Sequence, residues 1–281
     1  MQISYGDLPG QYRDPHHSSI VLVPVPFDAT STWIKGAERG PEAILEASAN
    51  MELYDIETGS QVYEKGIFTD EPLVPGRDPA VMVEAVHQRV HYWLEQAKFV
   101  VTIGGEHSIS LGPVLAHHRK YPDMSVLQLD AHTDLRPEYE GSPFNHACVM
   151  SRIAEICPIT QVGIRSMDIS EREFLDPERV FFQENLEGMN DWMDRVIATL
   201  NGNVYLTVDL DVLDPSIMPS TGTPEPGGME WYTLLKLLRR VSGERRIIGF
   251  DVVELCPSAH NRAPDFLAAK LIYKILSYCF N

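Results

Sequence analysis

Three short segments combine carboxylates and imidazoles at spacings that suit metal binding. In the first, Asp130, His132 and Asp134 follow an apolar run and stand two positions apart. Side chains alternate between the two faces of a strand, so these three can point to one side if the extended conformation continues past the strand end. A polar strand end with helix-capping aspartates is the alternative. The spacing favours a metal site.

The second segment is another apolar run that ends in aspartates. Asp209 and Asp211 follow residues 205–208 and are again two positions apart. Two carboxylates on one strand face repel each other unless a cation or a proton lies between them. A metal ion is the simplest source of that charge. Asp214 precedes Pro215 and is better interpreted as a turn residue than as a ligand.

The third segment places a histidine after a buried strand and a diglycine turn. The strand covers residues 99–103, and His107 stands at the start of the helix that follows Gly104 and Gly105. Glycine permits a positive φ and close backbone approach, which would bring His107 over the strand ends. Alone, His107 is equally compatible with a ligand and with a structural residue at a helix start. Beside the other two segments, the ligand interpretation is favoured.

These residues together predict a site for two metal ions rather than one. The site offers four carboxylates and two imidazoles, too many donors for one tetrahedral zinc ion. Such an oxygen-rich set favours a pair of five- or six-coordinate ions such as Mn²⁺, with shared carboxylates. A water molecule between the ions would lose its proton near neutral pH and act as a nucleophile. We therefore expect a metal-dependent hydrolase with the ligands His107, Asp130, His132, Asp134, Asp209 and Asp211.

The elements that would position these ligands alternate along the chain. Apolar, β-branched runs predict strands at 19–25, 99–103, 125–130, 159–162, 180–182, 204–209 and 246–253. Helical patterns lie at 40–49, 79–97, 108–119, 190–200, 231–241 and 264–278, with Asp78 and Ser108 as possible N-terminal caps. Such alternation is typical of a parallel sheet covered by helices on both faces. We expect one three-layer α/β/α domain over residues 1–281, with its ligand site at the carboxyl ends of the strands.

Composition limits the partners that the protein can have. The net charge is −17, which argues against nucleic acid and anionic membranes and favours a cationic substrate. The more ordinary interpretation is that an acidic surface mainly keeps a cytosolic protein soluble. The sequence does not begin with a basic region and an apolar run, and no apolar stretch approaches membrane-spanning length. We expect a soluble, cytoplasmic protein.

The three segments, in this order, resemble the ureohydrolases, the arginase and agmatinase family. The resemblance rests on Gly-Gly-Glu-His-Ser at 104–108, Asp-Ala-His-Thr-Asp at 130–134, Asp-Leu-Asp-Val-Leu-Asp-Pro at 209–215 and Thr-Gly-Thr-Pro-Glu-Pro-Gly-Gly at 221–228. It extends from residues 24–27 to 249–254 and so covers nearly the whole chain. It implies a three-layer α/β/α sandwich around a mainly parallel eight-stranded sheet, two manganese ions, and assembly into trimers or hexamers.

The resemblance also implies how the ligands are shared and which other residues act. One ion would be held by His107, Asp130, Asp134 and Asp209, and the other by Asp130, His132, Asp209 and Asp211. His146 matches a proton-shuttling histidine, and Glu254 matches a carboxylate that contacts the guanidinium. From the residues alone, His146 is a surface loop residue and Glu254 a strand-end acid. Asp251 is interpreted as structural.

A guanidinium hydrolysis follows as the mechanistic hypothesis. A hydroxide bridging the metals would attack the guanidinium carbon, and Glu254 would orient the cation through paired hydrogen bonds. Asp134 would help a proton reach the leaving amine, and His146 would relay protons to solvent. Urea and a primary amine would result.

The choice of substrate is expected to depend on the loop at residues 135–142. This loop lacks the Asn that arginases use for an α-carboxylate and looks more like that of agmatinases; Glu138 and Glu140 would suit a cationic amine. Arg136 would instead suit a carboxylate. We favour agmatine or aminopropylagmatine, cleaved to urea and an amine such as putrescine in polyamine biosynthesis. A guanidino-acid hydrolase of guanidinobutyrase, arginase or formimidoylglutamase type is the alternative, and the loop could also have no selective role.

Two other classes of protein are compatible with parts of the pattern. Zinc-dependent polyamine or protein deacetylases share the fold but have no use for the donors His107, Asp134 and Asp211, all of which are present. A scaffold without catalytic activity would not need the complete ligand set. Bound metal would separate the three classes: one zinc ion, two manganese ions or none.

Overall fold

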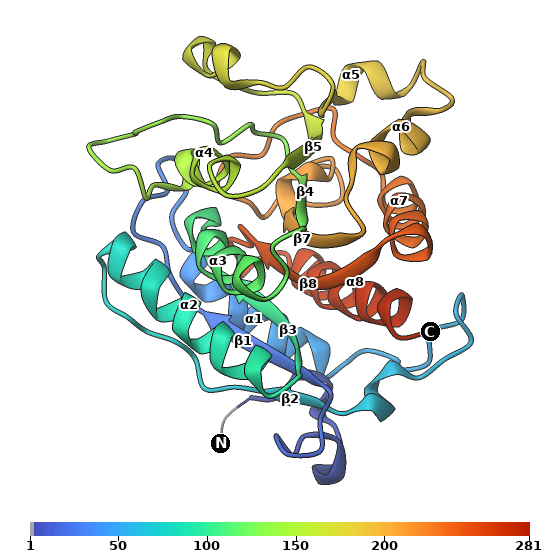
Figure 1. Ribbon diagram of the computed structural model, residues 1–281. Helices are drawn as coiled ribbons and strands as arrows, with labels where there is room; N and C mark the ends of the chain where they lie inside the picture. The colour runs from blue at the N-terminus through green and yellow to red at the C-terminus, as the bar shows by residue number, and fades with distance from the viewer. Residues whose placement is uncertain (1–2) are drawn as a thin grey trace.

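An eight-stranded parallel sheet forms the centre of the computed structural model, which describes residues 3–281 (Figure 1). Every pair of neighbouring strands is parallel, and the strand order is β2-β1-β3-β8-β7-β4-β5-β6. The strands are β1 (Ile20–Val25), β2 (Ile67–Thr69), β3 (Phe99–Gly104), β4 (Ser125–Leu129), β5 (Ile159–Ile164), β6 (Val180–Phe182), β7 (Asn203–Asp209) and β8 (Arg246–Val253).

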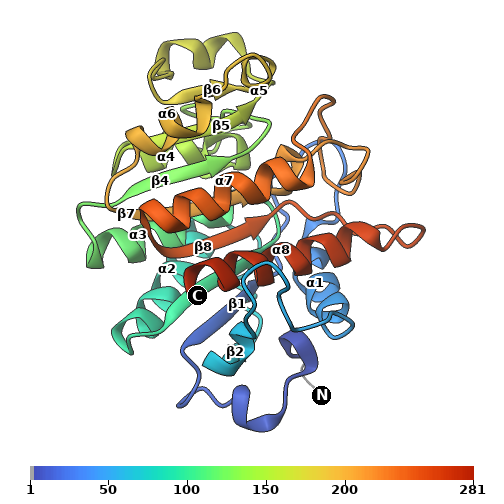
Figure 2. The same ribbon diagram turned by 90° about the vertical axis from the view of Figure 1, so that its right-hand side faces the viewer.

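Helices cover both faces of the sheet. Helices α2, α3 and α4 lie on one side, and α1, α6, α7 and α8 lie on the other (Figures 1 and 2). The helices are α1 (Gly40–Ser48), α2 (Pro79–Glu95), α3 (Leu111–Lys120), α4 (Val149–Ala154), α5 (Gln183–Leu186), α6 (Trp192–Thr199), α7 (Trp231–Glu244) and α8 (Ala263–Cys279). This is the predicted three-layer α/β/α architecture, and the prediction of an eight-stranded sheet is confirmed.

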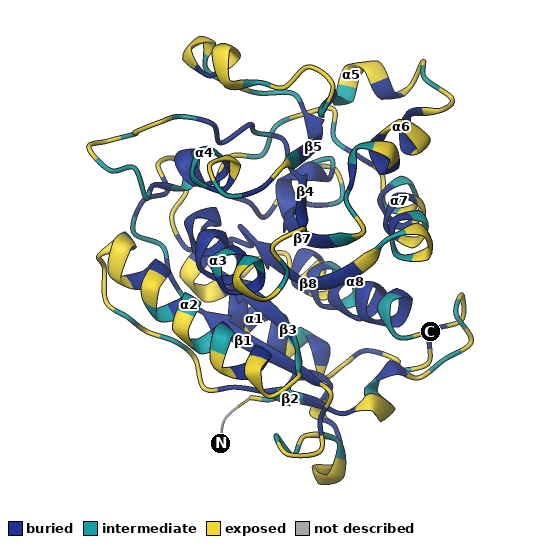
Figure 3. Cartoon of the chain, viewed as in Figure 1, coloured by how far each residue is buried: buried dark blue, intermediate teal, exposed yellow. Residues whose placement is uncertain are grey.

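The two faces of the sheet bury separate apolar cores. In β1, Leu22 packs into the core beneath α1 and α8, whereas Val21 and Val23 pack into the core beneath α2 and α3. The strands are accordingly buried along their length, and the exposed residues concentrate on the outer faces of the helices (Figure 3). A strand covered on both faces needs apolar residues at successive positions. This requirement explains why the strands could be recognised as continuous apolar runs.

The seven strands predicted from the residues are all present, each within two residues of its expected bounds. The apolar runs in the sequence did not predict β2, which has only three residues and pairs with β1 alone at the sheet edge. They also missed the short helices α4 and α5. Helices of one or two turns do not contain enough positions to display a period. A three-residue strand is at the limit, since β6 has the same length as β2 and was predicted.

One of the two expected helix caps is present, and the other is not. Asp78 caps α2, because its side chain accepts hydrogen bonds from the backbone N–H groups of Ala80 and Val81. Ser108 does not cap a helix. It lies within a 3₁₀ helix at His107–Ser110 that precedes α3, and its hydroxyl donates to Glu106.

The diglycine turn after β3 works through close approach and not through positive φ. Neither Gly104 nor Gly105 has a positive φ, so that expectation was wrong. Instead, a Cβ atom on Gly105 would lie 1.9 Å from the carbonyl oxygen of Phe27. The backbone of Gly105 donates to Val25 and accepts from Glu254, so it joins the ends of β1, β3 and β8.

Among the described residues, no helix is long and apolar enough to cross a membrane.

Replacing Gly105 with alanine should therefore destabilise the fold. The new methyl would meet backbone rather than a movable side chain, so we expect Gly105→Ala to lower the free energy of unfolding by about 3 kcal/mol. Gly243→Ala is the matched control, because Gly243 is exposed in α7 with no atom within 4 Å of the added Cβ. It should stabilise by roughly 0.5–1 kcal/mol. Urea unfolding measures both, and equal midpoints for Gly105→Ala and the wild type would contradict the packing argument.

Candidate metal centre

The six expected ligands follow three of the four adjacent strands at the centre of the sheet. His107 follows β3, Asp209 ends β7, and Asp130 follows β4. His132 and Asp134 lie in the segment after β4, and Asp211 lies in the turn after β7. Glu254 follows β8, the strand between β3 and β7. Because parallel strands end at the same edge, side chains more than 100 residues apart in sequence converge there.

The local conformations differ from the extended geometry that the sequence suggested. The extended conformation does not persist to Asp134, whose φ is +52°. The carbonyl of Asp134 accepts from the N–H groups of Met150 and Ser151 at the start of α4. These two hydrogen bonds fix the left-handed conformation of Asp134. Asp209 and Asp211 do not share a strand face, because Asp211 lies in a 3₁₀ helix whose N-terminus Asp209 caps. The side chains converge through turns, not through strand alternation.

The donor atoms form two overlapping groups around Asp130. In one, the Nδ1 atom of His107 lies 3.0 Å from Asp130 Oδ2 and 2.9 Å from Asp134 Oδ2. In the other, the Nδ1 atom of His132 lies 2.9 Å from Asp211 Oδ2 and 3.6 Å from Asp130 Oδ1. Within each group one ligand atom per residue lies within 4.8 Å of the others, so each group could hold a metal ion. The two oxygens of Asp130 thus face different groups.

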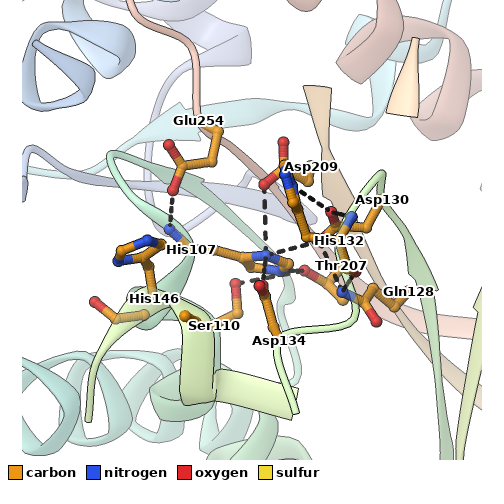
Figure 4. Close-up of polar contacts among 12 residues, drawn as sticks. His107, Ser110, Gln128, Asp130, His132, Asp134, His146, Thr207, Asp209 and Glu254 are labelled. Carbon is orange, nitrogen blue, oxygen red and sulfur yellow. Dashed lines mark hydrogen bonds and ion pairs between the residues drawn. The ribbon is translucent and has the colours of Figure 1, made fainter. Parts of the chain in front are cut away.

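Asp209 lies beside the first group. Its Oδ2 atom is 3.5 Å from Nδ1 of His107, and Figure 4 shows the His107 ring between the carboxylates of Asp209 and Asp134. The Nδ1 atom of His107 is buried and has no hydrogen-bond partner among the described residues. A buried nitrogen that faces three carboxylates without a hydrogen bond suits a metal ligand.

The carboxylates of the cluster are crowded at a buried place. Burial, followed by the charges of Asp211 and Asp130, raises the pKa of Asp209 well above its usual range. Burial and the charge of Asp130 raise the pKa of Asp134 to about 6. Cations placed among these oxygens would favour their charged forms. The electrostatics of the protein alone therefore favours binding of cations.

His107 is held in place from behind by a chain of buried polar groups. Its Nε2 atom lies 2.9 Å from the hydroxyl of Thr207, and that hydroxyl donates to Asp251 at 2.7 Å. Since the single hydroxyl proton of Thr207 goes to the carboxylate, Thr207 accepts from Nε2–H, which leaves Nδ1 of His107 unprotonated toward the cluster. Tyr205 donates to the other oxygen of Asp251. Asp251 therefore lies behind His107, in agreement with its interpretation as a structural residue.

Two buried glutamines, which sequence reasoning missed, hold the segment after β4. Gln161 donates to the side-chain oxygen of Gln128 and to the carbonyl of Thr133. Gln128 in turn donates to Asp130 Oδ2 at 2.7 Å and to the carbonyl of His132. The period-two alternation along β4 could have indicated that Gln128 points to the same face as Asp130.

A second missed pair, Glu106 and Thr30, positions His146. Glu106 is fully buried and accepts from the backbone N–H groups of Thr30 and Ser31 and from the hydroxyl of Thr30. That hydroxyl accepts in turn from the backbone N–H of His146 and lies 3.2 Å from its Nδ1. Because the proton of Thr30 is used toward Glu106, Nδ1 of His146 carries a proton and its Nε2 is the free acceptor.

His146 is not the surface residue that its position alone suggested. Its side chain lines the same cavity as the cluster. Burial, then the charges of His107 and His132, lowers the pKa of its imidazole to about 4. The ring is therefore neutral near pH 7.

Glu254 is held at the cavity wall by the backbone. One carboxylate oxygen, Oε1, accepts from the backbone N–H of His107 at 2.6 Å (Figure 4). Glu254 has a φ of +66° and its carboxylate lines the cavity beside the cluster. Burial and the charge of Glu106 raise its pKa well above the usual range. An arriving cation would favour its charged form.

The cavity that contains these groups has a volume of about 160 Å³, which suits a small molecule. Arg136 and Tyr139, from the loop predicted to select the substrate, contribute to its wall. Glu138 and Glu140 are exposed and are not among the described residues that line it, so their expected role in binding an amine finds no support. The acids on this side are Asp168 and Glu171, from the segment after β5.

Comparisons with known proteins agree with the fold and the cluster. The sequence profile of the arginase family matches residues 18–277. The chain is similar to the N(1)-aminopropylagmatine ureohydrolase of Synechocystis sp., with 40% identity over 93% of this chain and 89% of the relative. It is also similar to the agmatinase of Bacillus subtilis, with 33% identity over 91% and 90% of the two chains.

A solved structure shares the architecture. The agmatine ureohydrolase of Thermoplasma volcanium superimposes with a TM-score of 0.85 and 30% sequence identity, covering 96% of this chain and 92% of that one.

Loss of the Asp209 carboxylate, which lies beside the first group of donors, should impair metal binding. Loss of a side chain that only hydrogen-bonds to a metal ligand weakens metal binding by about 10–100-fold, and we expect Asp209→Asn to weaken Mn²⁺ binding by more than that. Asp214→Asn is the matched control, since Asp214 lies five residues away, accepts from the N–H groups of Gly227 and Gly228 in a turn, and should keep wild-type binding. Calorimetric titration of the metal-free proteins measures both. If Asp209→Asn bound Mn²⁺ with the affinity of the wild type, Asp209 would not be a metal ligand.

Proposed function

Because the chain belongs to the arginase family, we propose that it hydrolyses the guanidinium group of agmatine or of N(1)-aminopropylagmatine. Urea and an amine would be the products, and putrescine would be the amine formed from agmatine. The observation that carries the proposal is the sharing of Asp130 between two groups of metal-ligand donors, in a cavity that also contains Glu254 and His146. As a member of this family, the protein is a hydrolase that acts on C–N bonds of amidines.

The proposed cofactor is a pair of Mn²⁺ ions. His107, Asp130, Asp134 and Asp209 would hold one ion, and Asp130, His132, Asp209 and Asp211 the other. The mixture of two imidazoles with four carboxylates suits Mn²⁺ better than a thiolate-preferring metal. When bound, such ions would lower the pKa of a coordinated water so that a nucleophile is available near neutral pH.

Glu254 is the proposed anchor for the reacting end of the substrate. A guanidinium cation spreads its charge over three nitrogens, and a carboxylate can accept from two of them in parallel. Oε1 of Glu254 already accepts from His107 and is thereby held in one orientation, while Oε2 and the second lone pair of Oε1 are left for the guanidinium. The guanidinium carbon is a poor electrophile that is attacked slowly, and holding the cation in a fixed orientation raises the rate of attack.

Asp134 and His146 are the proposed carriers of protons. Asp134 lines the cavity and its Oδ2 lies 2.9 Å from Nδ1 of His107, so its carboxylate would be placed to accept a proton and pass it to the departing amine nitrogen. Nε2 of His146, the acceptor left free by Thr30, would then pass protons to solvent.

Substrates that end in an amine fit this chain better than those that end in an acid. The relatives from Synechocystis sp. and Bacillus subtilis are named for N(1)-aminopropylagmatine and for agmatine. Arg136, the residue that could bind a carboxylate, is already paired with Asp168 and Glu171. The family match does not favour a zinc deacetylase. A place in polyamine biosynthesis, a cytoplasmic location and assembly into trimers or hexamers remain predictions.

A urea-release assay with Mn²⁺-loaded protein tests the proposal directly. We expect urea from agmatine or N(1)-aminopropylagmatine, and much less from arginine and guanidinobutanoate. Protein treated with a chelator should be inactive and should recover when Mn²⁺ is returned. Absence of urea from all four compounds would overturn the proposed function.

His146→Ala tests the proposed proton relay. We expect kcat to fall by about 100-fold, the lower range for loss of a general acid–base group, while the Mn²⁺ content stays at the wild-type value. His260→Ala is the control, because His260 is exposed and does not line the cavity. Metal analysis accompanies the kinetics, and full turnover in His146→Ala would exclude the relay.

A further inference from the structure

A second cavity, here called the edge cavity, lies at the β6 end of the sheet. It has a volume of about 460 Å³, against about 160 Å³ for the cavity at the metal cluster, and its lining comes from β6, from α5 and α6 with the turn between them, and from the segment after β5. Strand β6 pairs only with β5, so no further strand covers this edge (Figure 2). None of the residues assigned a part in the proposed hydrolysis lines the edge cavity. Its volume is within the range of small-molecule sites.

The wall of the edge cavity is apolar except at three positions. Leu175 and Phe182 are among its apolar members, and its polar members are Arg172, Asn185 and Arg195. No carboxylate of the described residues lines it, although the protein has a net charge of −17. Small-molecule sites commonly combine an apolar wall with a few polar groups that fix orientation. Here the charged members are both cations, so the wall favours an anion.

The two arginines are not neutralised by neighbouring acids. The side chain of Arg172 has no hydrogen bond or ion pair with any described residue. Nη1 of Arg195 lies 3.1 Å from the sulfur of Met189, which is a weak acceptor. The adjacent carboxylate of Asp194 is paired with Arg240 instead. Both guanidinium groups therefore retain donors for a ligand, and guanidinium donors match the geometry of a carboxylate.

A 3₁₀ helix at Ile169–Phe174 separates the edge cavity from the cavity at the metal cluster. Glu171 lines the metal cavity, and its neighbour Arg172 lines the edge cavity. The first has an excess of carboxylates and the second has cations only. A cationic substrate and an anionic ligand would therefore be sorted to different sides of this helix.

We propose that the edge cavity binds a small carboxylate that carries an apolar chain, such as a medium-chain fatty acid. The carboxylate would bind Arg172 and Arg195, and the chain would be buried against the apolar wall that includes Leu175 and Phe182. The inference goes beyond the proposed hydrolysis and does not depend on it, because the two sites share no functional group. A second copy of this chain is the other occupant that an uncovered sheet edge admits.

Three probes separate the contributions of the charge and the chain in the Mn²⁺-loaded protein. Octanoate has both, acetate lacks the chain, and 1-octanol lacks the carboxylate. By calorimetric titration we expect octanoate to bind once per chain, and acetate and 1-octanol to bind about tenfold more weakly or less, since each loses apolar burial or charge-assisted hydrogen bonds. Excess agmatine should not displace octanoate. Equal affinities for acetate and octanoate would indicate coordination to the metal ions and would overturn the inference.

Substitutions in the wall test where octanoate binds. Asn185→Asp adds a carboxylate to the edge cavity at nearly constant side-chain size, and it should weaken octanoate binding about tenfold while leaving 1-octanol binding unchanged. Arg172→Gln should weaken octanoate binding by a similar factor. Arg119→Gln is the matched control, because Arg119 is exposed at the end of α3 and does not line the edge cavity. It should bind octanoate as the wild type does, and all variants should share the urea-unfolding midpoint of the wild type.

Each contrary outcome has one meaning. Absence of octanoate binding by the folded wild type would overturn the inference, and so would equal octanoate affinities of the wild type, Asn185→Asp and Arg172→Gln. If octanoate does not bind and light scattering shows that Asn185→Asp dissociates an oligomer, the edge cavity is a contact between copies of the chain. Urea release is measured separately, so failure of the proposed hydrolysis would leave the octanoate result intact.

Discussion

Parallel pairing of β3, β8, β7 and β4 is the constraint on which the site depends. Parallel strands place all their carboxyl ends at one edge, so each of these four strands ends beside the next. The register matches Ile103 to Val252 and Val208 to Val252, which puts the segments that follow at one level. His107, Glu254, Asp209 and Asp130 therefore start from neighbouring points, and only short turns are needed to bring their side chains together.

The turns do the remaining positioning, and they are held by buried polar networks. Glu106 joins the loop after β1 to the turn after β3, and the two glutamines join β5 to β4 and the loop that follows β4. An unsatisfied buried polar group costs about 1–3 kcal/mol, so each member of such a network specifies the conformation of its neighbours. The cluster of carboxylates and imidazoles is thus held by hydrogen bonds from behind, while its charge is left to be balanced from the cavity side.

Sequence reasoning succeeded where structure and chemistry are local. The buried strands are continuous apolar runs, and Asp130, His132 and Asp134 lie within five consecutive residues, so their types and spacing already indicate a metal site. It failed where contacts join distant segments. Thr30 and Glu106 are 76 residues apart, and nothing in the loop after β1 indicates that its threonine will orient His146. Glu254 and His146 were recognised through the family resemblance alone. The conformation of Asp134 was missed because strand alternation says nothing about the turn that follows.

Charge balance connects the two ends of the cavity at the metal cluster. In the proposed metal-bound enzyme, two dications would match the four carboxylates of Asp130, Asp134, Asp209 and Asp211. Glu254 would then be the negative group next to the reacting centre, and the wall that includes Arg136 would add the excess charge of Asp168 and Glu171 over that cation. The cavity would thus offer one net negative charge at each end. A small molecule with a guanidinium at one end and an ammonium at the other matches that distribution, whereas a guanidino acid matches only the end at Glu254.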